Sequence, residues 1–211
     1  MKKYLGFSLL VALSASVLMN AQNANPASDF VYDINSDGTG VVITAYEDKA
    51  KNVIVPVAIE DFPVVGCNLG DMFEKDNRIV SVALPNSCTE FYFEGCNSLE
   101  KVILPKELKT ISWNCVKGCK ALKAITLPDG LEKIDIHAFQ ESVLESIVIP
   151  TSVKSIGLAP FYGCTALITV TIGNGIQSIG HGAFAFCSTL TTFNIRVKEV
   201  IYENFHFPKH L

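Results

Sequence analysis

Charged residues are scarce in this sequence. Asp, Glu, Lys and Arg together make up 18% of the 211 residues, and the formal net charge is −4. Nucleic acid partners require a basic face that neutralises phosphates, and anionic membranes attract clustered Lys and Arg. The sequence therefore argues against nucleic acid and against a polybasic membrane-binding surface. Because apolar residues make up 49% of the chain, the composition also argues against disorder, and we expect one folded unit.

The sequence also lacks an apolar run of the roughly 20 residues that a membrane-spanning helix needs. Its longest uncharged apolar run, Tyr4 to Met19, has 16 residues. This run follows two lysines and ends shortly before Ala21, which is the layout of a secretory signal peptide. We predict a signal peptide over residues 1–21, with Ala24 as a second cleavage position and a retained membrane anchor as the alternative.

Cysteine is absent from the first 66 residues, so lipid attachment to a cysteine directly after the apolar run is excluded. Cleavage after Ala21 removes two lysines and no acid, which gives the mature chain a net charge of −6. We expect the protein to be secreted, or held at the cell surface or in the periplasm. We expect no integral membrane segment after cleavage.

Motifs of catalysis are missing as well. No Gly-rich phosphate loop, Ser-centred elbow or pair of catalytic carboxylates stands out. His137 and His181 fall in variable turns, and His206 and His210 are separated by Pro208 with no third metal ligand nearby. We expect no catalysis, no cofactor and no metal site, and we keep an enzyme as an alternative.

A repeat is the strongest feature that the sequence does contain. Leu144, Leu167 and Leu190 follow one another at steps of 23 residues, and Leu144 and Leu167 each precede an alternating apolar run, an Ile-Gly pair, a Phe and a Cys. A fixed period of this length is typical of leucine-rich-repeat solenoids. Extending the pattern towards the N-terminus gives six copies, whose Leu positions are Ile79, Leu99, Leu122, Leu144, Leu167 and Leu190. We predict a solenoid of about six coils.

Each copy contains a short predicted strand, of which residues 122–127 are an example. Ile125 and Leu127 alternate with smaller residues and should point inward, while Pro128 ends the strand because it cannot donate the next ladder hydrogen bond. One coil cannot bury its apolar residues alone, so neighbouring coils must stack. We therefore predict short parallel β-strands on one side of the solenoid, forming one six-stranded sheet, and irregular turns or short second strands opposite.

The repeat motif resembles a known family. The motif reads Ile156-Gly157, Phe161-x-x-Cys164 and Leu167-x-x-Val170-x-Ile172. It resembles the BspA-type leucine-rich repeats of exported bacterial proteins, over about Asp29 to Ile195. The stretch Trp113 to Val116 departs from the motif, and the copy that contains Cys96 is three residues short. The resemblance implies surface attachment and binding of host or matrix proteins, and it brings no shared catalytic residues.

A β-hairpin precedes the repeats. Two β-rich runs, Phe30 to Tyr32 and Val41 to Thr44, flank an Asp37-Gly38 turn signal. The acidic spacing also matches the first half of a calcium loop, but Thr44 stands where such a loop needs Glu, so we favour the hairpin. We predict a signal peptide over 1–21, an N-terminal β-hairpin cap over 22–50, repeats over 51–195 and a C-terminal cap or tail over 196–211.

Four of the seven cysteines occupy one repeat position, which Ser142 shares; they are Cys96, Cys119, Cys164 and Cys187. This pattern favours free buried thiols that bond the turn backbone from inside the coil. Disulfides within the pairs of adjacent coils are the alternative, because their Cα atoms would lie at a permissible separation.

The outward side chains of the strands are the predicted ligand-binding face. We single out Lys101, Ile103, Thr126, Ser146, Val148, Thr169, Thr171, Thr192 and Asn194. This face lacks the Trp, Tyr and Arg anchors of protein hot spots. Trp113, Tyr92 and Tyr162 are further candidates for contact, although we expect each of them to pack in the core. We predict binding or adhesion to a protein or glycan, with a structural scaffold of the cell envelope as the alternative.

Overall fold

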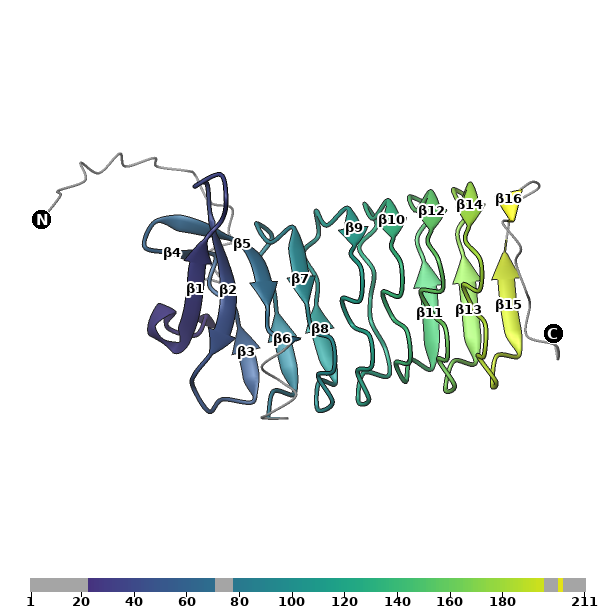
Figure 1. The fold of residues 1–211 in the computed structure, drawn as a ribbon, viewed down its shortest axis with the longest axis horizontal. Coiled ribbons are helices and arrows are strands. Elements are labelled where there is room, and N and C mark those ends of the chain that lie inside the picture. Colours follow the sequence, from purple (N-terminus) through teal and green to yellow (C-terminus); the bar gives the residue numbers. More distant parts are fainter. Residues whose placement is uncertain (1–22, 71–77, 196–200, 203–211) are drawn as a thin grey trace, which may run out of the picture.

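The chain forms an elongated stack of coils (Figure 1). The computed structural model describes residues 23–70, 78–195 and 201–202. The stack is a solenoid of about six turns with parallel strands, as the repeat predicts. Among the described residues, no helix is long and apolar enough to cross a membrane. The predicted signal peptide and nearly all of the predicted C-terminal tail lie outside the described residues.

One side of the solenoid carries two short parallel sheets. The first contains β3 (Asn52–Ile54), β6 (Ser81–Ala83) and β8 (Lys101–Ile103), and the second contains β11 (Ser146–Ile149), β13 (Thr169–Ile172) and β15 (Thr192–Ile195). Residues at the same position of successive repeats are paired, so that Ile147 lies beside Val170 and Val170 lies beside Phe193. Because side chains alternate along a strand, these residues point inward and their neighbours point to solvent.

The second strand of each coil forms another parallel sheet. It consists of β9 (Thr110–Ile111), β10 (Lys133–Ile134), β12 (Ser155–Ile156), β14 (Ser178–Ile179) and β16 (Ile201–Tyr202). The inward Ile of each described copy is buried, as Ile134 and Ile156 illustrate. These are the short second strands that the sequence predicts.

The N-terminal end is closed by antiparallel structure. After the 3-10 turn η1 (Ala27–Asp29), β1 (Phe30–Ile34) and β2 (Val41–Tyr46) form the predicted hairpin. The Asn35 side chain accepts hydrogen bonds from the Thr39 and Gly40 amides, and Gly38 has a φ of +72°. The Asn35 and Asp37 side chains, which belong to the stretch compared with a calcium loop, therefore accept hydrogen bonds from backbone amides of the turn. β2 then pairs in parallel with β5 (Phe62–Asn68), so the hairpin extends the coil stack.

The first coil is longer than the others because it contains an extra hairpin. β4 (Ala58–Ile59) pairs antiparallel with the start of β5, and the turn residues Glu60 and Asp61 have positive φ. β5 pairs in parallel with β7 (Glu90–Tyr92), the second strand of the next coil. This small hairpin is the insertion that lengthens the first repeat.

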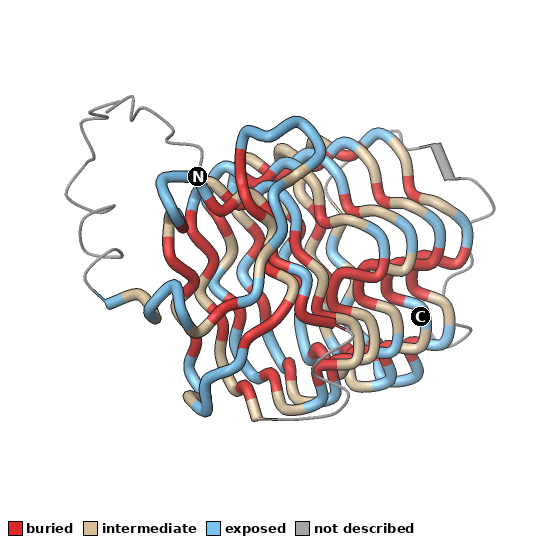
Figure 2. Tube along the Cα trace, turned by 60° about the vertical axis from the view of Figure 1, so that its left-hand side comes forward, coloured by how far each residue is buried: buried red, intermediate tan, exposed pale blue. Residues whose placement is uncertain are grey.

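The core is a column of equivalent residues from successive coils. Buried segments recur at the same place in each coil (Figure 2). Phe139, Phe161 and Phe184 are fully buried, and consecutive rings stack at centroid distances of 5.0 Å with interplanar angles of 2° and 4°. The Phe that recurs in the repeat motif therefore forms a stacked column through the core. Phe193 closes it with an edge-on contact to Phe184 at 5.2 Å.

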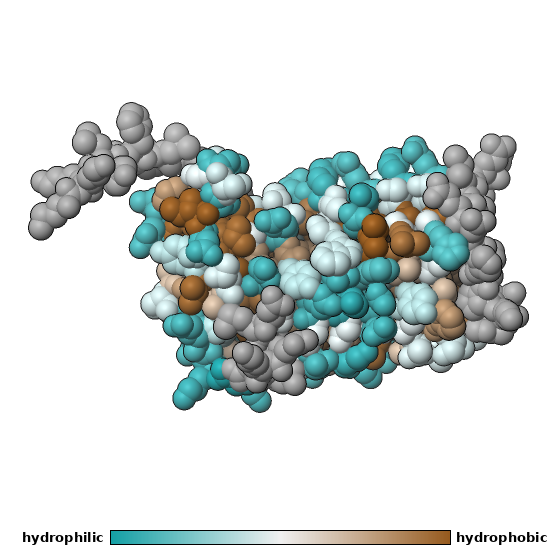
Figure 3. Space-filling model, viewed as in Figure 1, coloured by the Kyte–Doolittle hydropathy of each residue, from teal (hydrophilic) through white to brown (hydrophobic). Residues whose placement is uncertain are grey.

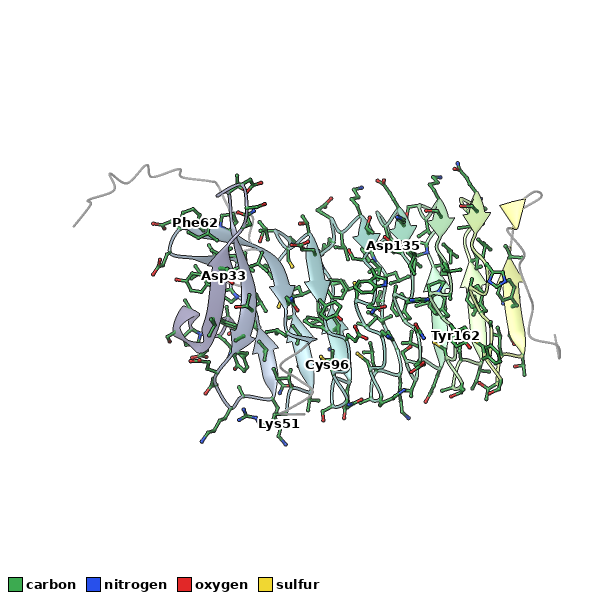
Figure 4. The ribbon with its side chains drawn as sticks, viewed as in Figure 1. Asp33, Lys51, Phe62, Cys96, Asp135 and Tyr162 are labelled. Carbon is green, nitrogen blue, oxygen red and sulfur yellow. The ribbon has the colours of Figure 1, made fainter. Side chains whose placement is uncertain are left out.

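The seven cysteines are free and buried. Cys119, Cys164 and Cys187 donate to the Phe93, Phe139 and Phe161 carbonyls of the preceding coils, at 3.1 to 3.2 Å. Ser142 joins the same ladder, since its Oγ lies 3.4 Å from the Cys164 Sγ. The thiols thus satisfy turn carbonyls in the way that the sequence predicts, and the alternative of disulfides is not realised. Cys96 is labelled in Figure 4.

The predicted six-stranded sheet is wrong in its middle. Residues 124–127 form no strand, although Ile125 and Leu127 are buried as predicted. Just before this segment, the Glu145 amide of the next coil bonds the Lys123 carbonyl at 2.9 Å. We call the hydrogen bonds between successive first strands (β3, β6, β8, β11, β13 and β15) the outer ladder, and those between successive second strands the second ladder. The outer ladder is therefore interrupted between β8 and β11.

The second ladder is interrupted one coil earlier. β7 and β9 lie in neighbouring coils but do not pair, and bonding resumes only where the Phe93 amide reaches the Cys115 carbonyl. Three successive junctions between coils therefore keep only one of their two ladders. The β6–β8 ladder holds the first junction, β9–β10 the second and β10–β12 the third.

Candidate functional site

The nine predicted ligand-binding residues all lie on the outward side of the strand face. Two rows run across the second outer sheet, Ser146-Thr169-Thr192 and Val148-Thr171-Asn194, because the strands pair without any offset. Val148 is the most exposed apolar residue of these rows, at 65%. Lys101 and Ile103 occupy the corresponding places on β8, and Thr126 lies between the two sheets.

A groove of about 1020 Å³ lies where the outer ladder is interrupted. The unpaired segment 124–127 forms one side of it, and the outward residues Ser146, Val148 and Thr171 form the other. Thr151 and Asn174, in the turns that follow β11 and β13, close one end. This groove gathers four of the nine predicted residues around one concave surface.

A second groove of about 610 Å³ lies on the other side of the same segment. It is lined by Lys101, Ile103 and Lys106 from the preceding coil and by Ala124 and Thr126. Thr126 therefore stands between the two grooves. Thr169, Thr192 and Asn194 line neither groove, so the structure divides the predicted residues into a grooved part and a flat part.

The backbone of the unpaired segment is available for hydrogen bonding. Within the described part of the chain, residues 124–127 neither donate nor accept a backbone hydrogen bond. In the regular coils the equivalent groups are used; for example, the Gly173 amide bonds the Ile149 carbonyl at 2.9 Å. Free amide and carbonyl groups beside outward Ser and Thr hydroxyls offer both donors and acceptors to a ligand.

Charges are sparse around the grooves. Lys123 and Glu145 form an exposed ion pair at 3.1 Å next to the interrupted ladder, and Lys109 pairs with Glu132 in the adjacent turns at 3.1 Å. Such exposed pairs contribute little to stability because water screens them. The strand face is therefore mainly neutral, and its recognition chemistry consists of hydroxyls, backbone groups and isolated apolar side chains.

The buried thiols are poor candidates for nucleophiles. Burial raises the pKa of Cys88, Cys115 and Cys187 to about 12, and that of Cys164 to about 11. The pKa of Cys67 is also raised well above its ordinary value by burial. A thiol attacks as the thiolate, so these raised pKa values keep the sulfur in its unreactive form at neutral pH.

No group of three or more His, Cys, Asp and Glu side chains that could hold a metal ion occurs within the parts of the chain that the structure describes. The spacing of His206 and His210 lies outside the described residues.

The sequence predicts the burial of two aromatic candidates incorrectly. Trp113 is 59% exposed and Tyr162, labelled in Figure 4, is also exposed, so the expectation of core packing is wrong for both. Tyr162 contacts Phe186, which is 68% exposed, at a ring-centroid distance of 4.9 Å. Alignment of the repeats could have predicted the exposure of Trp113. This residue occupies the same repeat position as Ile136 and Leu158, which are also exposed.

Apolar residues form small clusters on one face of the molecule. On the face shown in Figure 3, hydrophobic residues gather at the hairpin end and beside β10 and β12, among polar residues. Ile136 and Leu158 are both exposed and lie at equivalent positions of neighbouring coils, two residues after the paired Ile134 and Ile156. Clusters of this size are common on monomeric proteins and do not by themselves mark an interface.

The repeat region matches a family model, described as the BspA type leucine rich repeat region, in six copies over residues 86–209. The chain belongs to this family. The resemblance in the repeat motif is thereby confirmed, and so is the leucine-rich-repeat fold. No curated protein matches the chain at a significant level.

Solved structures agree with this assignment. The chain is similar to a T. pallidum leucine rich repeat protein, with 30% identity, a TM-score of 0.78, and coverage of 85% of this chain and 86% of the other. It is also similar to a leucine-rich repeat protein from Bacteroides ovatus, with 24% identity, a TM-score of 0.68, and coverage of 80% of this chain and 46% of the other. The second likeness supports the fold alone.

Proposed function

We propose that this BspA-type protein is exported and binds a protein or glycan through the outward face of its strands. The observation that carries the proposal is the groove at the interrupted ladder. There, free backbone groups of residues 124–127 face Ser146, Val148 and Thr171 across a concave surface of about 1020 Å³. A ligand bound in this groove hydrogen-bonds the free backbone groups of residues 124–127 and covers the exposed side chain of Val148.

Either ligand class fits this chemistry. An extended peptide supplies alternating amides and carbonyls, and a glycan supplies hydroxyls that both donate and accept. Asp129 is the one charged residue in the lining of this groove, so neutral polar groups supply most of its recognition chemistry. Host or matrix proteins and glycans are therefore the partners to test, as the family resemblance implies.

The groove can be tested with one substitution and a matched control. The mature chain is screened against matrix proteins and a glycan array, and each hit is remeasured with Val148→Asp. Asp adds an unpaired charge in the groove, so we expect affinity to fall by about tenfold or more. The control is Ile168→Asp, at a residue that is 47% exposed but outside both grooves, and it should keep affinity within about twofold.

A structural scaffold of the cell envelope is the second candidate. The observation that favours it is the lack of Trp, Tyr and Arg anchors in the outward rows. If no protein or glycan binds above background, the scaffold role replaces the binding role. Equal losses from the two Asp variants would remove the groove from the proposal.

Export is supported by the signal-peptide layout, and both predicted cleavage positions keep the contacts of Asn25. Asn25 is bonded into the first coil, because its side-chain oxygen accepts from the Ile54 amide at 2.8 Å and its amide bonds the Ile54 carbonyl at 2.9 Å. Cleavage after Ala21 or Ala24 leaves this residue in place. Sequencing of the exported protein should give Gln22 or Asn25 at the N-terminus, whereas a start at Met1 would contradict export by this route.

A further inference from the structure

A notch opens in the solenoid where β7 and β9 fail to pair. The cause is the short copy, in which Phe93 follows Phe91 after one residue, while the next copy places four residues between Ile111 and Val116. The three missing residues are those that would stand beside Trp113. The wall of the preceding coil is therefore absent there, and the indole is left exposed.

The notch forms a pocket of about 430 Å³ between the outward residues of β5, β7 and the turn after β9. Buried Cys67 and Phe91 form its base, and Tyr92 and Trp113 form aromatic walls. Its lining shares no residue with the two strand-face grooves. The pocket is thus a separate site, and it does not rest on the proposed function.

One aromatic wall is held in place. A Cβ added to Gly70 would lie 2.5 Å from Cδ1 of Tyr92, so the ring packs directly on this glycine. The Tyr92 hydroxyl bonds the Glu94 carboxylate, which also pairs with the Lys117 ammonium at 3.1 Å and accepts from the Asn114 side chain. This network fixes the ring before any ligand arrives, which reduces the entropy cost of binding.

The rim of the pocket carries an acid without a partner. The Glu90 side chain is exposed and has no hydrogen bond or ion pair in the described part of the chain. By contrast, Glu94 and Asp135 nearby each pair with a lysine at 3.1 Å. Gly66 leaves room for the carboxylate, because a Cβ there would lie 3.1 Å from Glu90 Oε1.

We propose that this pocket binds the basic side chain, Arg or Lys, of a protein partner. A cation over the face of Trp113 is attracted by the ring quadrupole, and tryptophan is the best aromatic residue for this contact. The same cation pairs with Glu90, while Asn68 and Ser112 on the rim accept its remaining N–H groups. The net charge of −4 favours the approach of a basic partner at long range.

Trp113 allows a direct test, because it is the only tryptophan in the sequence. Its fluorescence is followed while the full chain is titrated with acetyl-Gly-Arg-Gly-amide, acetyl-Gly-Lys-Gly-amide or the neutral acetyl-Gly-Gln-Gly-amide. We expect a saturable change with the two basic peptides, with a dissociation constant of about 1 mM, and none with the Gln peptide. The affinity should fall several-fold when the salt concentration is raised, because the ion pair is partly exposed.

Variants separate the pocket from the strand face. Glu90→Gln should lower the affinity for the Arg peptide about tenfold, while Glu132→Gln, a distant exposed acid, should leave it unchanged. Trp113→Leu removes the reporter, so calorimetry is used, and binding should be lost while the melting temperature is kept. Val148→Asp should bind the Arg peptide as the original chain does. A defect in the strand-face groove therefore leaves binding at the Trp113 pocket intact, and the two proposals can fail independently.

The proposal is overturned if no basic peptide gives saturation. N-acetylglucosamine is titrated as a neutral sugar probe. The proposal is also overturned if the Gln peptide or this sugar binds with the affinity of the Arg peptide and Glu90→Gln leaves the affinity for the Arg peptide unchanged. The latter result would make the pocket a neutral-ligand site.

Discussion

At the scale of single residues, the central Phe residues are the largest fully buried side chains among the described residues. Phe161 is fully buried and stacks on both Phe139 and Phe184. Phe161→Ala leaves a cavity between two coils and should lower the free energy of unfolding by about 3 to 5 kcal/mol. Denaturant unfolding measures this loss. Ile168→Ala, at an exposed position, should change it by less than about 0.5 kcal/mol, and similar losses from both would contradict the column.

The cysteines give a second residue-scale prediction. All seven are buried and free. The native chain should therefore react with a thiol reagent at pH 8 far more slowly than the denatured chain, which should show seven free thiols. Fewer than five thiols after denaturation without reductant would show that disulfides form and would contradict the ladder.

The raised pKa values also predict a pH dependence of stability. Burial holds the pKa of Cys88, Cys115 and Cys187 at about 12, above the ordinary thiol value of 9.0, so the unfolded chain loses these protons first. Their contribution to stability is complete below pH 9 and falls as the pH rises towards 12. The denaturant midpoint should decline over this range. Cys164→Ser, which copies the residue at Ser142, should flatten part of the decline.

At the scale of elements, the interrupted strand should be visible in amide exchange. Residues 124–127 have no backbone hydrogen bond in the described part of the chain, whereas the Ile168 and Gly173 amides bond carbonyls of the preceding coil at 2.9 Å. We expect the amides of 124–127 to exchange at least about 100-fold faster than those two. Equal protection would show that the outer ladder is continuous in solution.

The sequence predicts what faces inward much better than it predicts pairing between coils. The Phe, Leu and Cys positions form the column and the thiol ladder because each is dictated by burial within one coil. Residues 122–127 alternate as 144–149 do, yet only the latter pair as a strand. Pairing depends on the exact spacing of neighbouring backbones, which the alternation of side chains does not encode.

Trp113 illustrates a different reason for failure. A large apolar side chain suggests core packing when it is judged by hydrophobicity alone. Its exposure follows from the repeat register and from the short copy before it. The shortened repeat is readable in the sequence, but the pocket depends on how the next coil fills the gap, and this requires the three-dimensional arrangement.

At the scale of the whole molecule, the hairpin covers the first edge of the coil stack. Val41 and Ile43 of β2 are fully buried, and β2 pairs with β5. Deleting residues 23–50 would remove β2 and expose the edge of β5 and the apolar side chains that the hairpin covers, so we expect self-association in light scattering and a lower melting temperature. Replacing the exposed Val31 and Ile34 with Ser should leave the chain monomeric, and a monomeric deletion variant would contradict the capping role.

The alternation of ladders in the middle of the stack has a mechanical consequence. The coil that contains residues 124–127 bonds both of its neighbours along β10 and along the turn that follows β10, whereas on the outer strand face residues 124–127 have no backbone hydrogen bond in the described part of the chain. Under tension along the long axis, we therefore expect the outer strand face to separate between β8 and β11 before either ladder-bonded part of the stack does. Because this segment separates the two grooves, we expect such a movement to widen one groove as it narrows the other.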